Sequence, residues 1–223
     1  MNVKKVIDLS HTLYADCPGW TGQKRPVFSY DALYPEQGYT AERVDMNVHT
    51  GTHIDVPFHV SPYGARLDEI PVGDFQGMAV LIDFEKQNIP ACTEYMPEHF
   101  KPYEDKITEG SIVVYNNGWA NKRGYNHDYY TNWPYLSEEA AQWLADKKIK
   151  GICTDSMSVG GACKPDKAVP PHEALLLNGV WICEELNLVG DILNYETFYF
   201  CAFPLNFVGF TGSPVRAVAM IIE

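Results

Sequence analysis

Three histidines and one aspartate fall within eleven residues of this chain, in the segment His49-Thr50-Gly51-Thr52-His53-Ile54-Asp55-Val56-Pro57-Phe58-His59. Imidazole and carboxylate groups together suit zinc, manganese or iron, whereas calcium takes oxygen ligands. His53, Asp55 and His59 stand at even spacings, so an extended backbone would turn all three toward one side. The segment therefore predicts a metal site.

The local structure of this segment has a second interpretation. His49 and His53 are four residues apart, as on one face of a helix, but a helical zinc motif has Glu directly after the first His, where Thr50 stands here. Gly51 and the β-branched threonines beside it weaken a helix, and Pro57 would end it. We therefore expect a strand that runs into a loop. The alternative to a metal site is a polar loop in which the histidines satisfy their neighbours.

The segment resembles the His-x-Gly-Thr-His-x-Asp-x-Pro-x-His signature of the cyclase-like metal-dependent hydrolases, and every fixed position is present. This family includes bacterial kynurenine formamidase and isatin hydrolase, and the resemblance runs from residue 7 to residue 222. It implies an α/β chain with the swivelling β/β/α fold of the family, as one domain over residues 1–223.

Two further segments match the formamidase branch of the family. One is Pro-x-His-x-x-Leu-Leu, which contains His172, and the other is an apolar strand that ends in Glu-x-Leu, which contains Glu184. By itself His172 is typical of a surface position, and Glu184 could face water. The resemblance implies that His49, His53 and Asp55 hold one metal, and that Asp55, His172 and Glu184 hold a second. The expected ions are two Zn²⁺, with Mn²⁺ as the alternative, because the ligand types suit both.

The resemblance also implies roles for four other residues. His59 would be the proton donor and acceptor, since its ordinary pKa of about 6.5 suits proton transfer near neutrality, and the alternative is that it is another ligand. Trp20 would form an aromatic substrate wall, or else an ordinary core or interface position. Asp155 and Ser156 would orient a ligand or relay protons, and the alternative for Asp155 is to cap a turn.

The implied reaction is hydrolysis of a small amide by metal-activated water, with an arylformamide such as N-formylkynurenine as substrate, in tryptophan catabolism. The segments 116–119 and 158–161 depart from the family pattern, so a cyclic amide such as isatin, or a lactone, is the alternative. A metal-dependent lyase or cyclase and a non-catalytic metal-binding protein are alternatives of other classes. The chain has no Gly-x-Ser-x-Gly motif, which argues against a serine esterase.

The composition of the chain limits the classes of molecule that it is expected to bind. The chain has 223 residues, 46% hydrophobic and 21% charged, which suits one globular domain with a sizeable core. A net charge of −12 argues against nucleic acid and anionic membrane surfaces as partners. No apolar run has the length of a signal peptide core or a membrane span, so a cytoplasmic protein is expected. The resemblance suggests a homodimer or homotetramer that acts on a small, aromatic substrate.

Strands and helices that would position these residues are mixed along the chain, which is typical of an α/β or α+β domain. The segment 119–135 is rich in Tyr and Trp and is expected to form either an aromatic lid or pocket wall or, more in keeping with its composition, a subunit interface. Periodicity and end signals predict strands at 3–9, 43–49, 77–84, 112–115, 151–154, 180–183, 198–202 and 215–222, and helices at 137–148 and 171–177.

Overall fold

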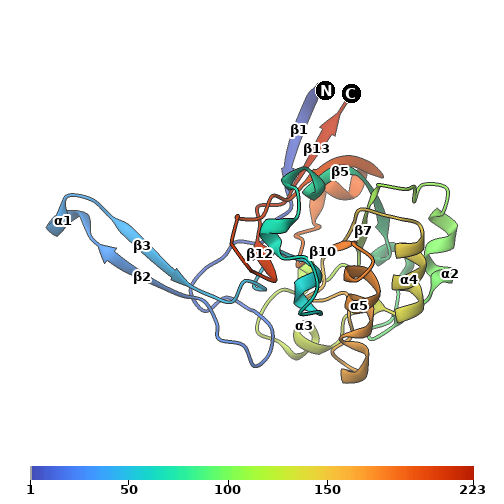
Figure 1. The fold of residues 1–223 in the computed structure, drawn as a ribbon, viewed down its shortest axis with the longest axis horizontal. Helices are drawn as coiled ribbons and strands as arrows, with labels where there is room; N and C mark the ends of the chain where they lie inside the picture. Colours follow the sequence, from blue (N-terminus) through green and yellow to red (C-terminus); the bar gives the residue numbers. More distant parts are fainter. Residues whose placement is uncertain (1) are drawn as a thin grey trace.

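A large, curled, mixed sheet is the frame of the molecule (Figure 1). The computed structural model describes residues 2–223. Within these residues the large sheet has the strand order β1-β13-β11-β5-β7-β9-β10-β4-β12. Its central strands β5, β7, β9 and β10 run parallel to one another, and the strands on both sides are antiparallel. The strands are β1 (Val3–Asp8), β4 (His53–Asp55), β5 (Gln76–Asp83), β7 (Ile112–Asn116), β9 (Gly151–Thr154), β10 (Trp181–Glu184), β11 (Thr197–Cys201), β12 (Gly212–Pro214) and β13 (Val218–Ile222).

The α-helices are short, and the longest is α4, which Ser137 caps by accepting a hydrogen bond from the Ala140 backbone N–H. Helix α5 begins with two prolines, which suit the first turn because their missing N–H groups would have no partner there. The five α-helices of the described residues are α1 (Tyr34–Gln37), α2 (Pro97–Phe100), α3 (His127–Thr131), α4 (Glu138–Asp146) and α5 (Pro170–Leu176). Two short strands outside the large sheet, β6 (Glu94–Tyr95) and β8 (Tyr135–Leu136), pair in parallel.

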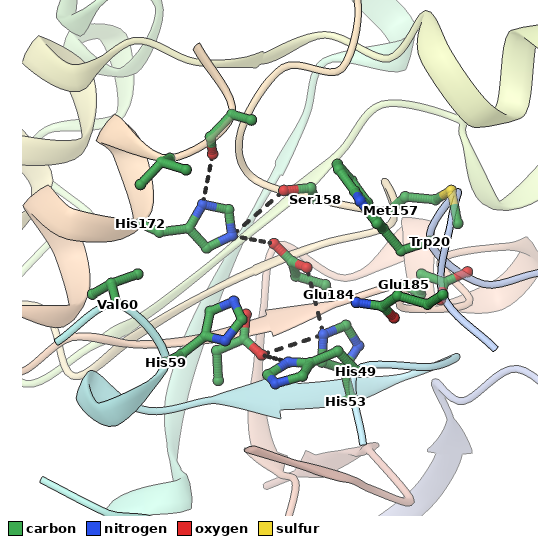
Figure 2. A pocket seen from close by; sticks show the side chains of 14 residues that line it. Trp20, His49, His53, His59, Val60, Met157, Ser158, His172, Glu184 and Glu185 are labelled. Atoms are coloured by element: carbon green, nitrogen blue, oxygen red, sulfur yellow. Dashed lines mark hydrogen bonds and ion pairs between the residues drawn. The ribbon is translucent and has the colours of Figure 1, made fainter. Parts of the chain in front are cut away.

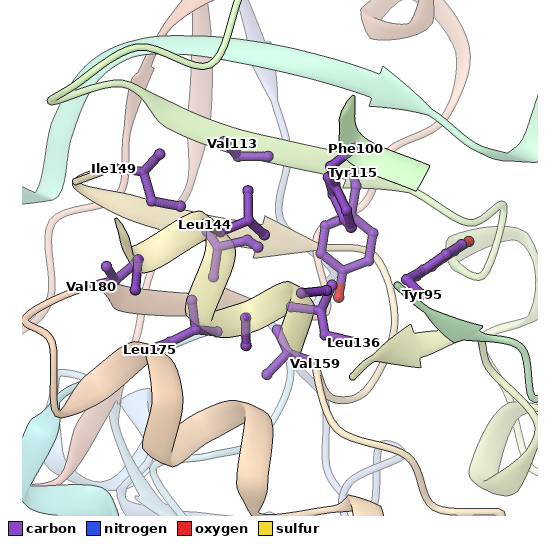
Figure 3. Packing of buried hydrophobic residues seen from close by; sticks show 14 of the residues in the cluster. Tyr95, Phe100, Val113, Tyr115, Leu136, Leu144, Ile149, Val159, Leu175 and Val180 are labelled. Atoms are coloured by element: carbon purple, nitrogen blue, oxygen red, sulfur yellow. The ribbon is translucent and has the colours of Figure 1, made fainter. Parts of the chain in front are cut away.

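Alternation along the central strands divides the core between the two faces of the sheet. On one face, Val113, Tyr115 and Ile182 pack under α2, α4 and α5, where Leu144 and Leu175 fill the space (Figure 3). On the other face, the neighbouring strand residues Val114 and Cys183 belong to a second cluster, which also includes Phe200 of β11, Ala219 of β13 and residues of several short turns. Strand side chains on the first of these faces therefore point toward α5 and can meet the side chains that α5 carries.

The pair β2 (Val27–Ala32) and β3 (Ala41–Asp45) forms a separate two-stranded arm, which carries α1 at its tip and projects away from the rest of the molecule (Figure 1). The register places Phe28 opposite Val44 and Ser29 opposite Arg43. One face of the arm is consequently mainly apolar, with Glu42 opposite Tyr30 as its charged residue, while the other carries the Asp31–Arg43 ion pair. Both faces are largely exposed in the chain as it stands.

The α/β class is confirmed, and the expected strands and helices lie close to the observed ones. The exception is the strand expected at 43–49, which was predicted to lead into the metal segment. Instead, β3 ends at Asp45 and pairs only with β2, a strand that was not predicted. Of the three alternating residues, only Val44 lies in β3, on the exposed arm, while Met46 and Val48 lie in the loop that follows. None of the helices formed by residues 2–223 combines the length and the apolar character needed to span a bilayer.

Candidate metal centre

Strand register brings the first three candidate ligands together. Strand β4 pairs antiparallel with β10, so that His53 lies opposite Glu184, and Asp55 lies opposite Ile182. Residues two apart on a strand share a face, and so do residues directly opposite each other. His53, Asp55 and Glu184 therefore point to one side of the sheet. That side is the one that α5 covers, because Ile182 packs in the same cluster as Leu175 of α5.

His172 reaches this group from the first turn of α5 (Figure 2). Its Nε2 lies 3.2 Å from Glu184 Oε1, and its Nδ1–H donates to the Ala168 carbonyl oxygen at 2.9 Å. His53 is held in the same manner, since its Nδ1–H donates to the Gly51 carbonyl oxygen at 2.8 Å. A backbone acceptor on one ring nitrogen fixes the tautomer and leaves Nε2 free to bind a metal, which is the usual arrangement around metal-binding histidines.

His49 completes the set from the loop before β4. Its Nδ1 lies 2.6 Å from Asp55 Oδ1, and its Nε2 lies 2.8 Å from Thr211 Oγ1. Gly212, next to that threonine, permits this close approach: a Cβ there would lie 2.3 Å from the Ile54 carbonyl oxygen and 3.0 Å from His49 Cε1. Thr211 and Gly212 were not identified from the sequence, because they lie far along the chain, in and beside the edge strand β12, and belong to no recognisable motif.

The distances between the donor atoms of these side chains, and the burial of Asp55, fit a divalent metal ion. Asp55 Oδ2 is buried and has no hydrogen-bond partner among the described residues, an unusual state for a carboxylate oxygen. His53 Nε2 lies 3.3 Å from Asp55 Oδ1 and 3.5 Å from Glu184 Oε2. Ligand atoms placed tetrahedrally around one zinc ion lie about 3.3 Å apart. The donor atoms form two groups, and Asp55 belongs to both: His49, Asp55 and His59 make the first, and His53, Asp55 and Glu184 the second.

The electrostatics of the centre favour positive charge. Burial by itself would lower the pKa of His53, but the nearby Asp55 and Glu184 carboxylates raise it to about 10. Burial opposes the charge of His172 too, yet Glu184 raises the pKa of that ring above its usual value. Two buried carboxylates thus favour positive charge beside them, and a bound cation would supply that charge.

His59 stands beside the group on the short turn η1 (Pro57–His59). Its ring centroid lies 4.2 Å from that of His49 and 6.0 Å from that of His172. Burial in the pocket lowers the pKa of His59, an effect that Asp55 partly offsets. The position allows both interpretations made from the sequence, a proton carrier beside the metal or a further ligand.

A cavity of about 440 Å³ opens over these residues. Its volume suits a small aromatic molecule. The predicted wall residue Trp20 lines it, and Met157, Val60 and Val169 provide further apolar surface. Lys and Arg are absent from the described residues that line it.

Asp155 and Ser156 occupy different surroundings. The Asp155 carboxylate is buried and accepts hydrogen bonds from the backbone N–H groups of Asn117, Trp119 and Ala120. The Ser156 hydroxyl accepts from Asn117 Nδ2 at 2.8 Å. Their described side-chain contacts are thus with residues 117–120 rather than with the candidate ligands, and the roles expected for them in orienting a ligand or relaying protons stay predictions.

The aromatic segment itself is mainly core, and the residues that line the cavity include none from 119–135, whereas its expected part in a subunit interface stays a prediction. Trp119, Tyr129, Trp133 and Tyr135 are buried in one cluster, and Trp20 packs against it with its ring centroid 6.0 Å from that of Trp133. The density of aromatic residues was visible in the sequence, but their burial within the same chain was not. The segment supports the pocket wall from behind.

Comparisons with known proteins agree with this geometry. The sequence pattern of the family named Cyclase, described as "Putative cyclase", matches residues 7–160. A kynurenine formamidase of Bacillus thuringiensis strain Al Hakam is 29% identical over 221 residues, which cover 98% of both chains, and that of Bacillus anthracis gives the same values. Among solved structures, isatin hydrolase A of Labrenzia aggregata bound to benzyl benzoate superimposes with a TM-score of 0.85 at 28% identity, covering 98% of this chain and 94% of that one.

Proposed function

Because the chain belongs to the Cyclase family, we propose that it is a metal-dependent hydrolase of a small aryl amide, with all 223 residues acting as one domain. The observation that carries the proposal is the convergence of His49, His53, Asp55, His172 and Glu184 on one face beneath a cavity. The full-length similarity to kynurenine formamidases and to an isatin hydrolase supports amide hydrolysis as the reaction.

The five residues would hold up to two divalent ions: Asp55 belongs to both donor groups, and His172 would join through its contact with Glu184, whose Oε1 lies 3.2 Å from His172 Nε2. Zn²⁺ is the favoured ion and Mn²⁺ the alternative, since imidazole and carboxylate suit both. When bound, such an ion supplies Lewis acidity, which lowers the pKa of water and polarises a carbonyl group.

The remaining residues of the pocket orient the substrate and move a proton. Trp20 and Met157 offer an apolar wall to an aromatic ring, which places the amide carbonyl over the ligand cluster. His59, open to the pocket, is positioned to pass a proton to the leaving nitrogen. N-Formylkynurenine is the substrate that the formamidase relatives favour, while a cyclic amide such as isatin is the second candidate because of the isatin hydrolase neighbour.

Steady-state hydrolysis tests this function. The protein is stripped with a chelator, restored with Zn²⁺ or Mn²⁺, and assayed with N-formylkynurenine and with isatin. We expect turnover of at least one substrate only after a metal is restored, and ¹⁸O from labelled water in the product. Metal-loaded protein that turns over neither compound would refute amide hydrolysis of this class, and product without ¹⁸O would indicate the lyase alternative.

We also propose that the arm formed by β2 and β3 joins two copies of the chain. On its apolar face and tip, Tyr30, Tyr34 and Tyr39 are 64%, 69% and 60% exposed, and Phe28 and Val44 are exposed beside them. Covering these side chains would bury about 600 Å² on each copy, close to the ~800 Å² per partner of a standard interface. The exposed apolar residues of the 203–210 loop offer a second surface of the same chain for a two-fold contact.

Sedimentation analysis at micromolar concentration tests whether the arm joins two copies of the chain. We expect the wild-type chain to be at least dimeric and the double variant Phe28→Ser with Tyr30→Ser to be monomeric. Ser29→Gln, on the polar face of the same strand, is the matched control and keeps the wild-type size. A monomeric wild-type protein, or a variant that remains dimeric, would remove the arm from the interface.

A further inference from the structure

A second buried carboxylate directly follows the candidate ligand Glu184. Glu185 is 1% exposed and has a φ of +53°, a left-handed conformation that residues with a Cβ adopt at an energetic cost. Its Oε1 accepts a hydrogen bond from the Tyr129 hydroxyl and lies 3.6 Å from Arg123 Nε. Glycine would suit this backbone better, so the contacts of the Glu185 side chain must offset the cost of this conformation.

The partners of Glu185 come from a distant part of the chain. Arg123 and Tyr129 both lie in the aromatic segment, and the Arg123 side chain is only 9% exposed. Tyr129 is positioned by the short helix α3, whose N-cap Asn126 accepts a hydrogen bond from the Tyr129 backbone N–H. The segment therefore delivers a guanidinium and a hydroxyl to one buried carboxylate.

The backbone of Glu185 links the two halves of the metal centre. Its N–H donates to the Ser156 carbonyl oxygen at 2.9 Å, and its carbonyl oxygen accepts from Thr52 Oγ1 at 2.6 Å. Thr52 immediately precedes His53, and Glu185 immediately follows Glu184, which lies opposite His53 in the sheet. A shift of residue 185 would thus move Glu184 directly, as its neighbour in the chain, and would move His53 through the hydrogen bond to Thr52.

We propose that Arg123, Tyr129 and Glu185 form a positioning network that holds the start of β4, at His53, against the end of β10, at Glu184. This inference rests on the proposed metal site. By fixing the left-handed residue 185, the network fixes the separation of two ligands on opposite strands. Groups that orient metal ligands in this way are worth 10- to 100-fold in metal affinity.

Two variants separate positioning from a merely structural role. Tyr129→Phe removes one hydroxyl and leaves the buried fold otherwise intact. The double variant Arg123→Met with Glu185→Met removes both charges at similar volume, a change that is often neutral or stabilising for the fold. Tyr103→Phe is the matched control, because it also loses a tyrosine hydroxyl with one side-chain partner, Gln87, remote from the centre.

The affinity of each metal-free protein for Zn²⁺ is measured by competition with a chromophoric chelator, together with the unfolding midpoint of the metal-free form. We expect Zn²⁺ to bind 10- to 100-fold more weakly to Tyr129→Phe and to the double variant, with unfolding midpoints near that of the wild type, and Tyr103→Phe to bind as the wild type does. If the double variant does not fold, Tyr129→Phe decides alone. Wild-type affinity in Tyr129→Phe would overturn the positioning role, whereas a wild-type protein that binds neither Zn²⁺ nor Mn²⁺ would instead refute the proposed function.

Discussion

Acidification between pH 6.5 and pH 5 is expected to destabilise the protein through His11. This residue lies beneath the metal loop, where its backbone N–H donates to Thr52 Oγ1 at 3.0 Å. Its Nε2 is buried with no hydrogen-bond partner among the described residues. Burial, assisted by the positive charge of Arg123, lowers the pKa of His11 to about 3.

The sign and size of the effect follow from proton linkage. In the unfolded chain the pKa of His11 returns to about 6.5, so between pH 6.5 and pH 3 the unfolded state binds a proton that the folded state excludes. The free energy of unfolding therefore falls as the pH falls through this window, by about 1.4 kcal/mol per pH unit. At pH 5 the loss amounts to about 2 kcal/mol, and above pH 6.5 there is none.

Urea unfolding of the wild type and of His11→Gln, both metal-free in excess chelator, measures this effect from pH 7.5 to pH 5. The other titrating groups are common to both proteins and cancel in the difference. Between pH 7.5 and pH 5, we expect the free energy of unfolding of the wild type to fall by about 2 kcal/mol more than that of the variant. Parallel curves would show that His11 takes up its proton in the folded state and would refute the reasoning.

Three other predictions concern the metal centre and the fold. Glu184→Gln is expected to lose one of two bound ions first, and His53→Ala to lower bound metal as well, both measured by elemental analysis; full occupancy in a variant would remove the substituted residue from the ligand set and refute the proposed two-ion arrangement of ligands. His59→Ala is expected to keep its metal and lose at least 100-fold in kcat, the usual contribution of acid–base catalysis, while loss of metal would make His59 a ligand. Ser137→Ala removes the cap of α4 and is expected to cost about 1 kcal/mol in urea unfolding, with unchanged metal content; an unchanged midpoint would show that the cap hydrogen bond contributes nothing.

Local chemistry made part of this protein predictable from its sequence. The density of His49, His53, Asp55 and His59 within eleven residues indicated a metal site, and the caps and charges of 137–148 indicated a helix. Both signals lie in neighbouring residues, so no knowledge of the distant chain was needed. His172 and Glu184 were added through resemblance to a family, because a lone histidine and a strand-end carboxylate carry little information by themselves.

Tertiary structure alone decided what surrounds those residues. The contact of Thr211 with His49, the burial of the aromatic segment and the pairing of Arg123 and Tyr129 with Glu185 all join residues that are far apart in the chain. The strand expected at 43–49 shows the same limit, since alternation predicts an extended backbone but not the partner that the strand pairs with. Periodicity is a property of consecutive residues, whereas register, burial and the surroundings of a charge depend on which distant segments pack together.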